Sequence, residues 1–458
     1  MKSLFLFLSA VATAGAAFGA MPAIDSVVLR QDGDRVVTVD YELRDAPAIV
    51  TVEFLTNGVP VDVADCTRLS GDVNRFVSTG AVRRLAWQPS GALADASDGP
   101  LTARLTAWPL ATPPDVMVVD LFDFRDYALA RGNPQNVRFY TSVRALPEGG
   151  LDNRGLYALT NMVFVKVHAA GKTARLGCPK YMEVEMPDGP NYYREAPYVA
   201  TFSRDYYMAV YELTQQQCRW FYIAPTPGSV GSMLPVMNFS YTDIRGATNG
   251  VNWPTNTTTA AADDVDATSL VGQFRTKYGL RVDLPTAAEW EFACRAGSLN
   301  NFYALPDSPA YWDDGHTANY ACTTVCRPSD ANFGRQHEAF IRDYCWNSLN
   351  SGNAAHPVGE KAPNAFGLYD MAGNAFEFVL DRESANAAGK AAKKANSPIL
   401  DPKGATSGNS AFVLGGYYGA DGNGNRVWSM SPVSRTTRSN VSGLRLKCYA
   451  DMSAWEGR

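Results

Sequence analysis

Residues 362–381 read APNAFGLYDMAGNAFEFVLD, and residues 284–297 read LPTAAEWEFACRAG. In the second stretch, the Thr286 hydroxyl can accept from the backbone N–H three residues on while Glu289 reaches back, which is the capping box that begins a helix. Between such helices, the chain is dominated by Gly, Pro, Asn and Asp. We therefore expect a domain with short helices, long loops and sparse regular structure.

Two more helices are predicted in the same part of the chain. Thr214 and Gln217 form a second capping box, followed by Cys218 and Phe221 on one face of the helix. The segment 270–278 is a third helix, ended by Gly279.

Six stretches, in this order, resemble landmarks of the formylglycine-generating enzyme (sulfatase-modifying factor) family. They are YMAVYELTQQQCRWF from Tyr207, LPVMNFSYTDIRG from Leu234, the two stretches quoted above, VLGGYYG from Val413 and SGLRLKC from Ser442. The resemblance covers residues 155–450 and implies an α+β variant of the C-type-lectin-like fold with sparse regular structure and bound calcium. It also suggests a bacterial source. Family members include enzymes and binding modules, so the site must decide the function.

The copper enzymes of this family hold their metal with two thiolates that follow a Gly-Gly turn. Counted from Gly415-Gly416, those positions fall on Ala420 and Asn425, and residues 417–428 contain neither cysteine nor histidine. Monovalent copper prefers sulfur ligands. We therefore expect neither a copper cofactor nor catalytic residues. An iron centre, which other members of the family carry, is not expected either, because it needs several histidine ligands and the sequence contains no close pair of histidines. The four histidines are His168, His316, His337 and His356.

The resemblance implies one metal site, a structural calcium loop. Its ligands would be side-chain oxygens of Asp370 and Glu377 and backbone carbonyls of Gly373 and Ala375. Calcium prefers six to eight oxygen ligands, and a Gly-containing turn can direct carbonyls inward between two acidic residues. The alternative is that both carboxylates only hydrogen-bond to the loop backbone.

A candidate ligand-binding segment follows the Gly-Gly pair. Asp421 and Asn423 lie in a Gly- and Asn-rich loop, at the place of the enzymes' active-site loop. Trp428 and Arg435 could line a polar pocket beside it, although such residues are more often packed or paired with opposite charges.

The N-terminal part has a different pattern. Segments at 37–43, 50–54 and 101–107 alternate apolar and polar residues, as half-buried strands do. We therefore predict an accessory β-sandwich of immunoglobulin or fibronectin type over residues 21–110. Residues 111–154 are expected to form a linker and lead-in strands, and 451–458 a C-terminal tail.

The N-terminal sequence, the net charge and the cysteine content indicate the cellular location and the classes of partner. Residues 1–20 read as a signal peptide, so the protein is expected to be secreted, periplasmic or at the cell surface, with no membrane span after processing. The net charge of −5, without a long basic block, argues against nucleic acid. Eight cysteines allow disulfides. Cys322, Cys326 and Cys345 form a local cluster in the sequence, for which we favour a disulfide or free thiols over a zinc site.

These features predict a secreted, non-catalytic recognition protein that binds a protein or glycan outside the cytoplasm. The alternative is a formylglycine-generating oxidoreductase that acts on a cysteine of exported sulfatases. The feature that distinguishes these two functions is the presence or absence of sulfur ligands for monovalent copper.

Overall fold

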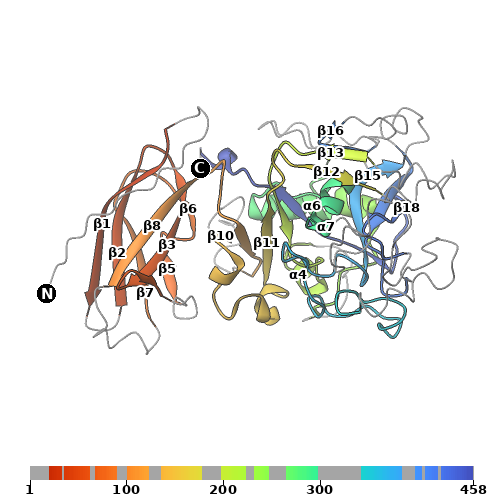
Figure 1. Ribbon diagram of the computed structural model, residues 1–458, viewed down its shortest axis with the longest axis horizontal. Coiled ribbons are helices and arrows are strands. Elements are labelled where there is room, and N and C mark those ends of the chain that lie inside the picture. The colour runs from red at the N-terminus through yellow and green to blue at the C-terminus, as the bar shows by residue number, and fades with distance from the viewer. Residues whose placement is uncertain are drawn as a thin grey trace, which may run out of the picture. The chain divides into compact units, whose positions relative to one another are not determined.

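The computed structural model divides the chain into two compact units, residues 1–157 with 450–458, and residues 158–449 (Figure 1). It describes residues 20–32, 36–61, 68–89, 101–122, 136–177, 198–222, 232–246, 265–297, 342–383, 398–404, 408–420 and 424–456. The predicted signal peptide lies outside these residues, apart from Ala20. Within the described ranges, no helix has the length and apolar character needed to cross a bilayer.

The first unit contains two antiparallel sheets around one core. One sheet has the order β1-β2-β7-β5; in the other, β3 pairs with β8 and also with β4 and β6. The strands are β1 (Ala23–Asp32), β2 (Val36–Arg44), β3 (Ala48–Thr56), β4 (Val59–Pro60), β5 (Leu69–Gly71), β6 (Arg75–Val77), β7 (Arg83–Trp87) and β8 (Leu101–Pro109).

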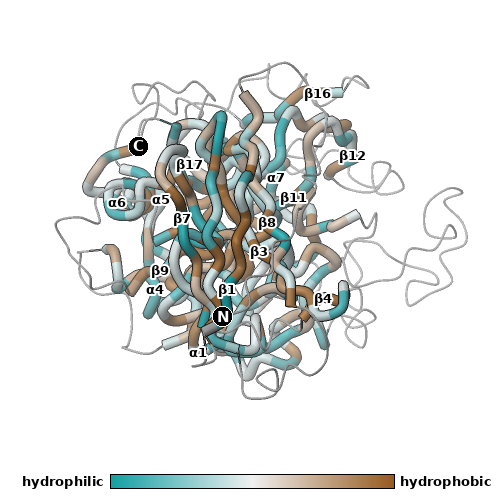
Figure 2. Tube along the Cα trace, turned by 90° about the vertical axis from the view of Figure 1, so that its left-hand side faces the viewer, coloured by the Kyte–Doolittle hydropathy of each residue, from teal (hydrophilic) through white to brown (hydrophobic). Residues whose placement is uncertain are grey.

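The predicted strands at 37–43, 50–54 and 101–107 are confirmed as β2, β3 and β8. Hydrophobic and hydrophilic residues interleave along β3 and β8 (Figure 2). Phe54 of one sheet stacks on Trp87 of the other, with ring centroids 4.2 Å apart. Burial of these alternating apolar side chains is what holds the two sheets together.

The segment predicted as linker and lead-in, and the predicted tail, both belong to the first unit. The C-terminal Trp455 is 3% exposed and packs edge-on against Phe76 and Phe139, with centroids 6.2 and 6.0 Å away. Burying an indole in this way ties the chain end to the unit. The elements here are β9 (Val116–Asp120), β10 (Val137–Tyr140), η4 (Val143–Ala145), η5 (Gly150–Asp152), α1 (Arg154–Tyr157) and η8 (Ser453–Trp455).

The second unit combines several small sheets with short helices. One sheet runs β11-β14-β20, another β12-β13-β16 and a third β18-β17-β15-β19. The strands are β11 (Asn161–Val167), β12 (Thr173–Leu176), β13 (Tyr198–Thr201), β14 (Tyr206–Ala209), β15 (Phe376–Glu383), β16 (Ile399–Leu400), β17 (Ser410–Leu414), β18 (Met430–Ser434), β19 (Ser442–Leu444) and β20 (Lys447–Tyr449). This mixed architecture agrees with the predicted α+β class and its sparse regular structure.

The three predicted helices are present; two begin at their predicted capping boxes, and the third spans the predicted residues. They are α4 (Gln215–Phe221), α6 (Leu270–Tyr278) and α7 (Ala287–Arg295). Both predicted capping boxes form, and Gly279 ends α6 in the left-handed conformation with φ 67°. A further helix, α5 (Tyr241–Arg245), was not predicted and begins at a capping box of Ser240 and Asp243.

Candidate functional site

A buried ion pair lies at the centre of the second unit. Glu377 comes from β15 and Arg445 from the short segment between β19 and β20, and their side chains are 1% and 0% exposed. Arg445 Nη2 lies 2.8 Å from Glu377 Oε1, while Trp290 Nε1 of α7 donates to Glu377 Oε2 at 2.6 Å. The guanidinium also donates to three backbone carbonyls, those of Ala209, Val210 and Tyr369.

Two further carboxyl groups surround this pair. Glu212 accepts from the Asn374 amide at 2.6 Å and from the backbone N–H of Ala375 at 2.9 Å. Asp370 accepts from the N–H of Gly359 at 2.7 Å. Burial raises the pKa of Glu212 well above its usual range, and the charges of Asp370 and Glu377 add to this effect. Burial likewise raises the pKa of Asp370 to about 6.

The predicted calcium ligands lie in one loop, which leads from Asp370 into β15. Asp370 and Gly373 both have positive φ, 55° and 77°, so the loop turns sharply between the acidic residues. Asp370 fits a cation site, because its Oδ1 is buried and has no hydrogen-bond partner among the described residues. Glu377 fits less well, since Arg445 and Trp290 already donate to both of its oxygens. A cation bound in this loop would share the Glu377 carboxylate with the guanidinium of Arg445.

The two residues onto which the resemblance places the family's copper-binding thiolates come together in this fold. Asn425 Nδ2 donates to the carbonyl of Ala420 at 3.3 Å, and the two residues are 0% and 8% exposed. A Cβ on Gly416 would come within 1.8 Å of Asn425 Oδ1, so the glycine leaves room for this amide. Ala420 and Asn425 are thus neighbours in this fold, and neither supplies sulfur.

None of the four cysteines in the described ranges is part of a disulfide. They are all buried and are Cys218, Cys294, Cys345 and Cys448. Burial raises the pKa of the Cys218 and Cys345 thiols, which disfavours the thiolate form that binds metal. Cys345 is thus a thiol, while Cys322 and Cys326 lie outside the described residues. Over the described part of the chain, no three His, Cys, Asp or Glu side chains gather to hold a metal ion.

Half-buried aromatic side chains border the Ala420 position. We call Trp346, His356, Phe376, Tyr417 and Tyr418 the aromatic rim. Trp346 stacks on His356 with centroids 3.6 Å apart, and the ring centroids of Phe376 and Tyr417 are 5.1 Å apart. Hydrogen bonds link the segment that follows Trp346 to the segment that contains Tyr417 and Tyr418. Ser348 N–H donates to the carbonyl of Ala420, and the Ser351 hydroxyl donates to the carbonyl of Tyr418.

Sequence reasoning did not single out the rim. Its only local signal is the Tyr417-Tyr418 pair directly after the two glycines. Lys361 lies over the Trp346 ring, 3.8 Å from its centroid, and adds a cation to this surface. Trp346 Nε1 is buried, and within the described ranges it has no hydrogen-bond acceptor.

Of the four predicted ligand-binding residues, two lie outside the described residues and two are buried. Asp421 and Asn423 fall outside the described residues. Trp428 is 1% exposed and lies 3.8 Å below the Arg426 guanidinium, and Arg435 is 8% exposed beside Tyr241. Both side chains are packed in the interior, so a ligand would reach them only after the chain above them moved.

Fold and site together define a domain of the sulfatase-modifying factor type. Residues 178–448 match the family model of the sulfatase-modifying factor enzyme 1-like domain (FGE-sulfatase). This match covers more than half of the chain, which therefore belongs to that family.

Curated relatives include formylglycine-generating enzymes from Streptomyces coelicolor, 28% identical over 38% of this chain and 48% of the relative, and from Bos taurus, 27% identical over 37% and 38%. A chaperone protein, LppX of Paenibacillus barcinonensis, is 25% identical over 39% of this chain and 63% of its own. The chain thus matches about half or less of the enzymes' length. Among solved structures, Treponema denticola variable protein 1 aligns with a TM-score of 0.40 and 20% identity, covering 63% of this chain and 95% of that one.

Proposed function

We propose that this protein is an exported, non-catalytic binding protein, built on a sulfatase-modifying factor domain. The observation that supports the proposal is the Asn425–Ala420 contact at the copper positions. An amide and a methyl group cannot replace two thiolates as ligands for monovalent copper. The C-type-lectin-like variant of the fold and secretion through the N-terminal segment stay predictions.

The aromatic rim is the surface we propose for the ligand. Its rings are half-buried, so part of each ring stays exposed beside polar groups. Such surfaces suit a sugar ring or an apolar side chain of a protein partner, which is the protein or glycan class expected from the sequence. The rim borders Ala420, which the resemblance aligns with the copper site of the family's enzymes, and this proximity is why we place the ligand there.

One experiment with two measurements tests this proposal. The purified protein is loaded with Cu(I), and oxygen consumption is followed with a cysteine-containing sulfatase peptide. We expect neither stoichiometric copper nor turnover, whereas the Ala420→Cys/Asn425→Cys variant should gain Cu(I) affinity because it restores a pair of thiolates. Stoichiometric copper with turnover in the parent protein would favour the alternative, a formylglycine-generating oxidoreductase.

The same preparation is screened on arrays of glycans and exported proteins. Tyr417→Ala should lower capture about tenfold, since an aromatic contact contributes on the order of 1 kcal/mol or more. Leu400→Ala is the matched control, because Leu400 is 64% exposed and lies on β16, outside the rim. Equal capture by the parent and Tyr417→Ala would argue against the rim.

We also propose that calcium stabilises the loop from Asp370 to Glu377. The unpartnered Asp370 Oδ1, beside the negative charge of Glu377, supports a cation here. Calcium at about 100 times its dissociation constant should stabilise the fold by about 2.7 kcal/mol, which differential scanning calorimetry detects as a higher melting temperature. Asp370→Asn should remove this response, and magnesium should not reproduce it. An identical melting temperature of the parent in calcium and in chelator would eliminate the proposal.

A further inference from the structure

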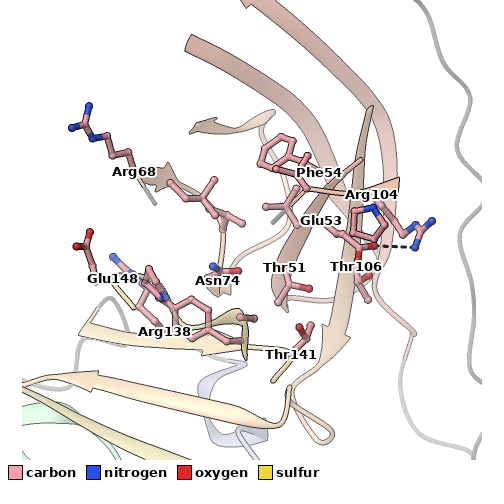
Figure 3. A pocket seen from close by; sticks show the side chains of 18 residues that line it. Thr51, Glu53, Phe54, Arg68, Asn74, Arg104, Thr106, Arg138, Thr141 and Glu148 are labelled. Atoms are coloured by element: carbon pink, nitrogen blue, oxygen red, sulfur yellow. Dashed lines mark hydrogen bonds and ion pairs between the residues drawn. The ribbon is translucent and has the colours of Figure 1, made fainter. Parts of the chain in front are cut away.

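The first unit contains a pocket of about 560 Å³ beside strand β3 (Figure 3). A volume of this size is typical of sites for small ligands. Strands β3 and β8 of the sandwich supply one wall. Another wall comes from the segment 137–148, which we call the β10 wall, and Figure 3 shows Arg138, Thr141 and Glu148 on it. The pocket therefore depends on how this segment is held against the sandwich.

Strand β10 presents different side chains to its two faces. Arg138 and Tyr140 line the pocket, whereas Phe139, between them, is 0% exposed. Successive side chains of a strand point to opposite faces, so the Phe139 ring lies behind the wall. The backbone N–H of Phe139 donates to the carbonyl of Asn74, a pocket residue, at 2.7 Å. This hydrogen bond joins the β10 wall to the sandwich.

A distant segment of the chain packs behind the same wall. Residues 450–456, which we call the strap, return to the first unit after β20. Trp455 of the strap is 3% exposed and packs edge-on against Phe139 of the wall and Phe76 of β6, with ring centroids 6.0 and 6.2 Å away. The indole of Trp455 thus contacts the wall and the sandwich at once.

A second contact anchors the strap to the sandwich. Met452 is 3% exposed, and its backbone N–H donates to the carbonyl of Leu110, the residue after β8, at 2.7 Å. Between and beyond the two buried anchors, the side chains of Asp451, Ala454 and Glu456 are exposed. The strap contains the short helix η8 and is not a strand of either sheet of the sandwich, so it can detach without breaking a strand ladder.

We infer that the strap is a conformational device that holds the β10 wall in place, so that the pocket opens on the wall side when the strap detaches. The wall and the sandwich share Trp455, and loss of its indole would leave a cavity between Phe139 and Phe76. The hydrogen bond between Phe139 and Asn74 offsets little of that loss, because water can replace a bond of this kind once the wall opens. Strap and pocket both belong to the first unit, so this inference does not rest on the function proposed for the second.

Amide hydrogen exchange of the full-length protein tests the strap. In Trp455→Ala, the Phe139 amide should exchange at least about tenfold faster, because opening of the wall breaks its bond to Asn74. The amides of Val39 and Leu85, which pair in the β2–β7 ladder, should exchange as in the parent. Glu456→Ala is the matched control on the strap, since Glu456 is exposed, and it should leave the Phe139 amide unchanged.

Nitration of Tyr140 then reports on the pocket itself. Burial raises the pKa of the Tyr140 hydroxyl to about 12, so in the parent this side chain should react slowly with tetranitromethane, which attacks the tyrosinate. Detachment of the strap exposes the hydroxyl and lowers its pKa, so Trp455→Ala should be nitrated faster at Tyr140, as mass spectrometry of the digested protein measures.

A second variant covers the case in which Trp455→Ala does not fold. Trp455→Leu keeps an apolar side chain but loses the edge-on contacts with Phe139 and Phe76, so it should give a smaller acceleration confined to the β10 wall. Unchanged exchange of Phe139 in the folded variants would overturn the inference. An acceleration that is equal at Val39, Leu85 and Phe139, or unchanged nitration of Tyr140, would overturn it as well.

Discussion

Replacement of Arg445 by methionine is expected to lower the free energy of unfolding by about 3–5 kcal/mol, the usual cost of leaving a buried charge without its partner. Arg445 is 0% exposed and is the cation that contacts Glu377 directly. Its loss also leaves the carbonyls of Ala209 and Val210 without their guanidinium donor. Methionine keeps much of the side-chain length, so lost charge rather than lost volume should dominate.

Calorimetric unfolding of the purified variant measures this effect on the second unit. The matched control is Arg445→Met/Glu377→Gln, in which neither partner of the pair is charged. The double variant should recover part of the stability, because no ionised Glu377 stays buried. Parent-like melting of Arg445→Met would show that the pair contributes little.

A second large effect is expected at Arg245, which forms a buried pair with Asp283. Arg245 Nε and Nη2 donate to the two carboxylate oxygens at 2.8 and 2.9 Å, and both side chains are 2% exposed. Arg245→Met should lower the free energy of unfolding by about 3 kcal/mol. Arg275 still contacts Asp283 at 3.1 Å and limits the loss.

The chain offers a close comparison for this pair. Arg438 donates to Asp243 with the same two-fold geometry, at 2.8 Å for each bond, but its side chain is 56% exposed. Water and ions screen such a pair, so Arg438→Ala should cost no more than about 1 kcal/mol. Urea titration of both variants separates burial from geometry, and equal losses would contradict the role given to burial.

Local hydrogen bonds made much of the second unit predictable. The capping boxes at Thr214 and Thr286 link residues three apart, and Gly279 ends its helix through its own backbone conformation. The fold class followed from such signals and from ordered motifs. The alternation in β2 and β8 was equally readable, because burial of every second side chain is a property of a single strand.

The site residues were predictable only in part. The sequence showed that Ala420 and Asn425 lack sulfur, and the structure brought these two residues into contact. No pattern in the sequence indicated that Glu377 pairs with Arg445, which lies 68 residues further along the chain. For that reason the predicted calcium loop acquired a competing cation only in three dimensions.

The sequence by itself therefore determined which chemistry the copper positions lack, where helices begin and which strands have a buried face, since each depends on residue type or on neighbours within a few positions. Tertiary structure alone decided that Glu212 contacts Asn374 across 162 residues and that the aromatic rim assembles. These features depend on the path of the chain between distant segments, and no local pattern encodes that path.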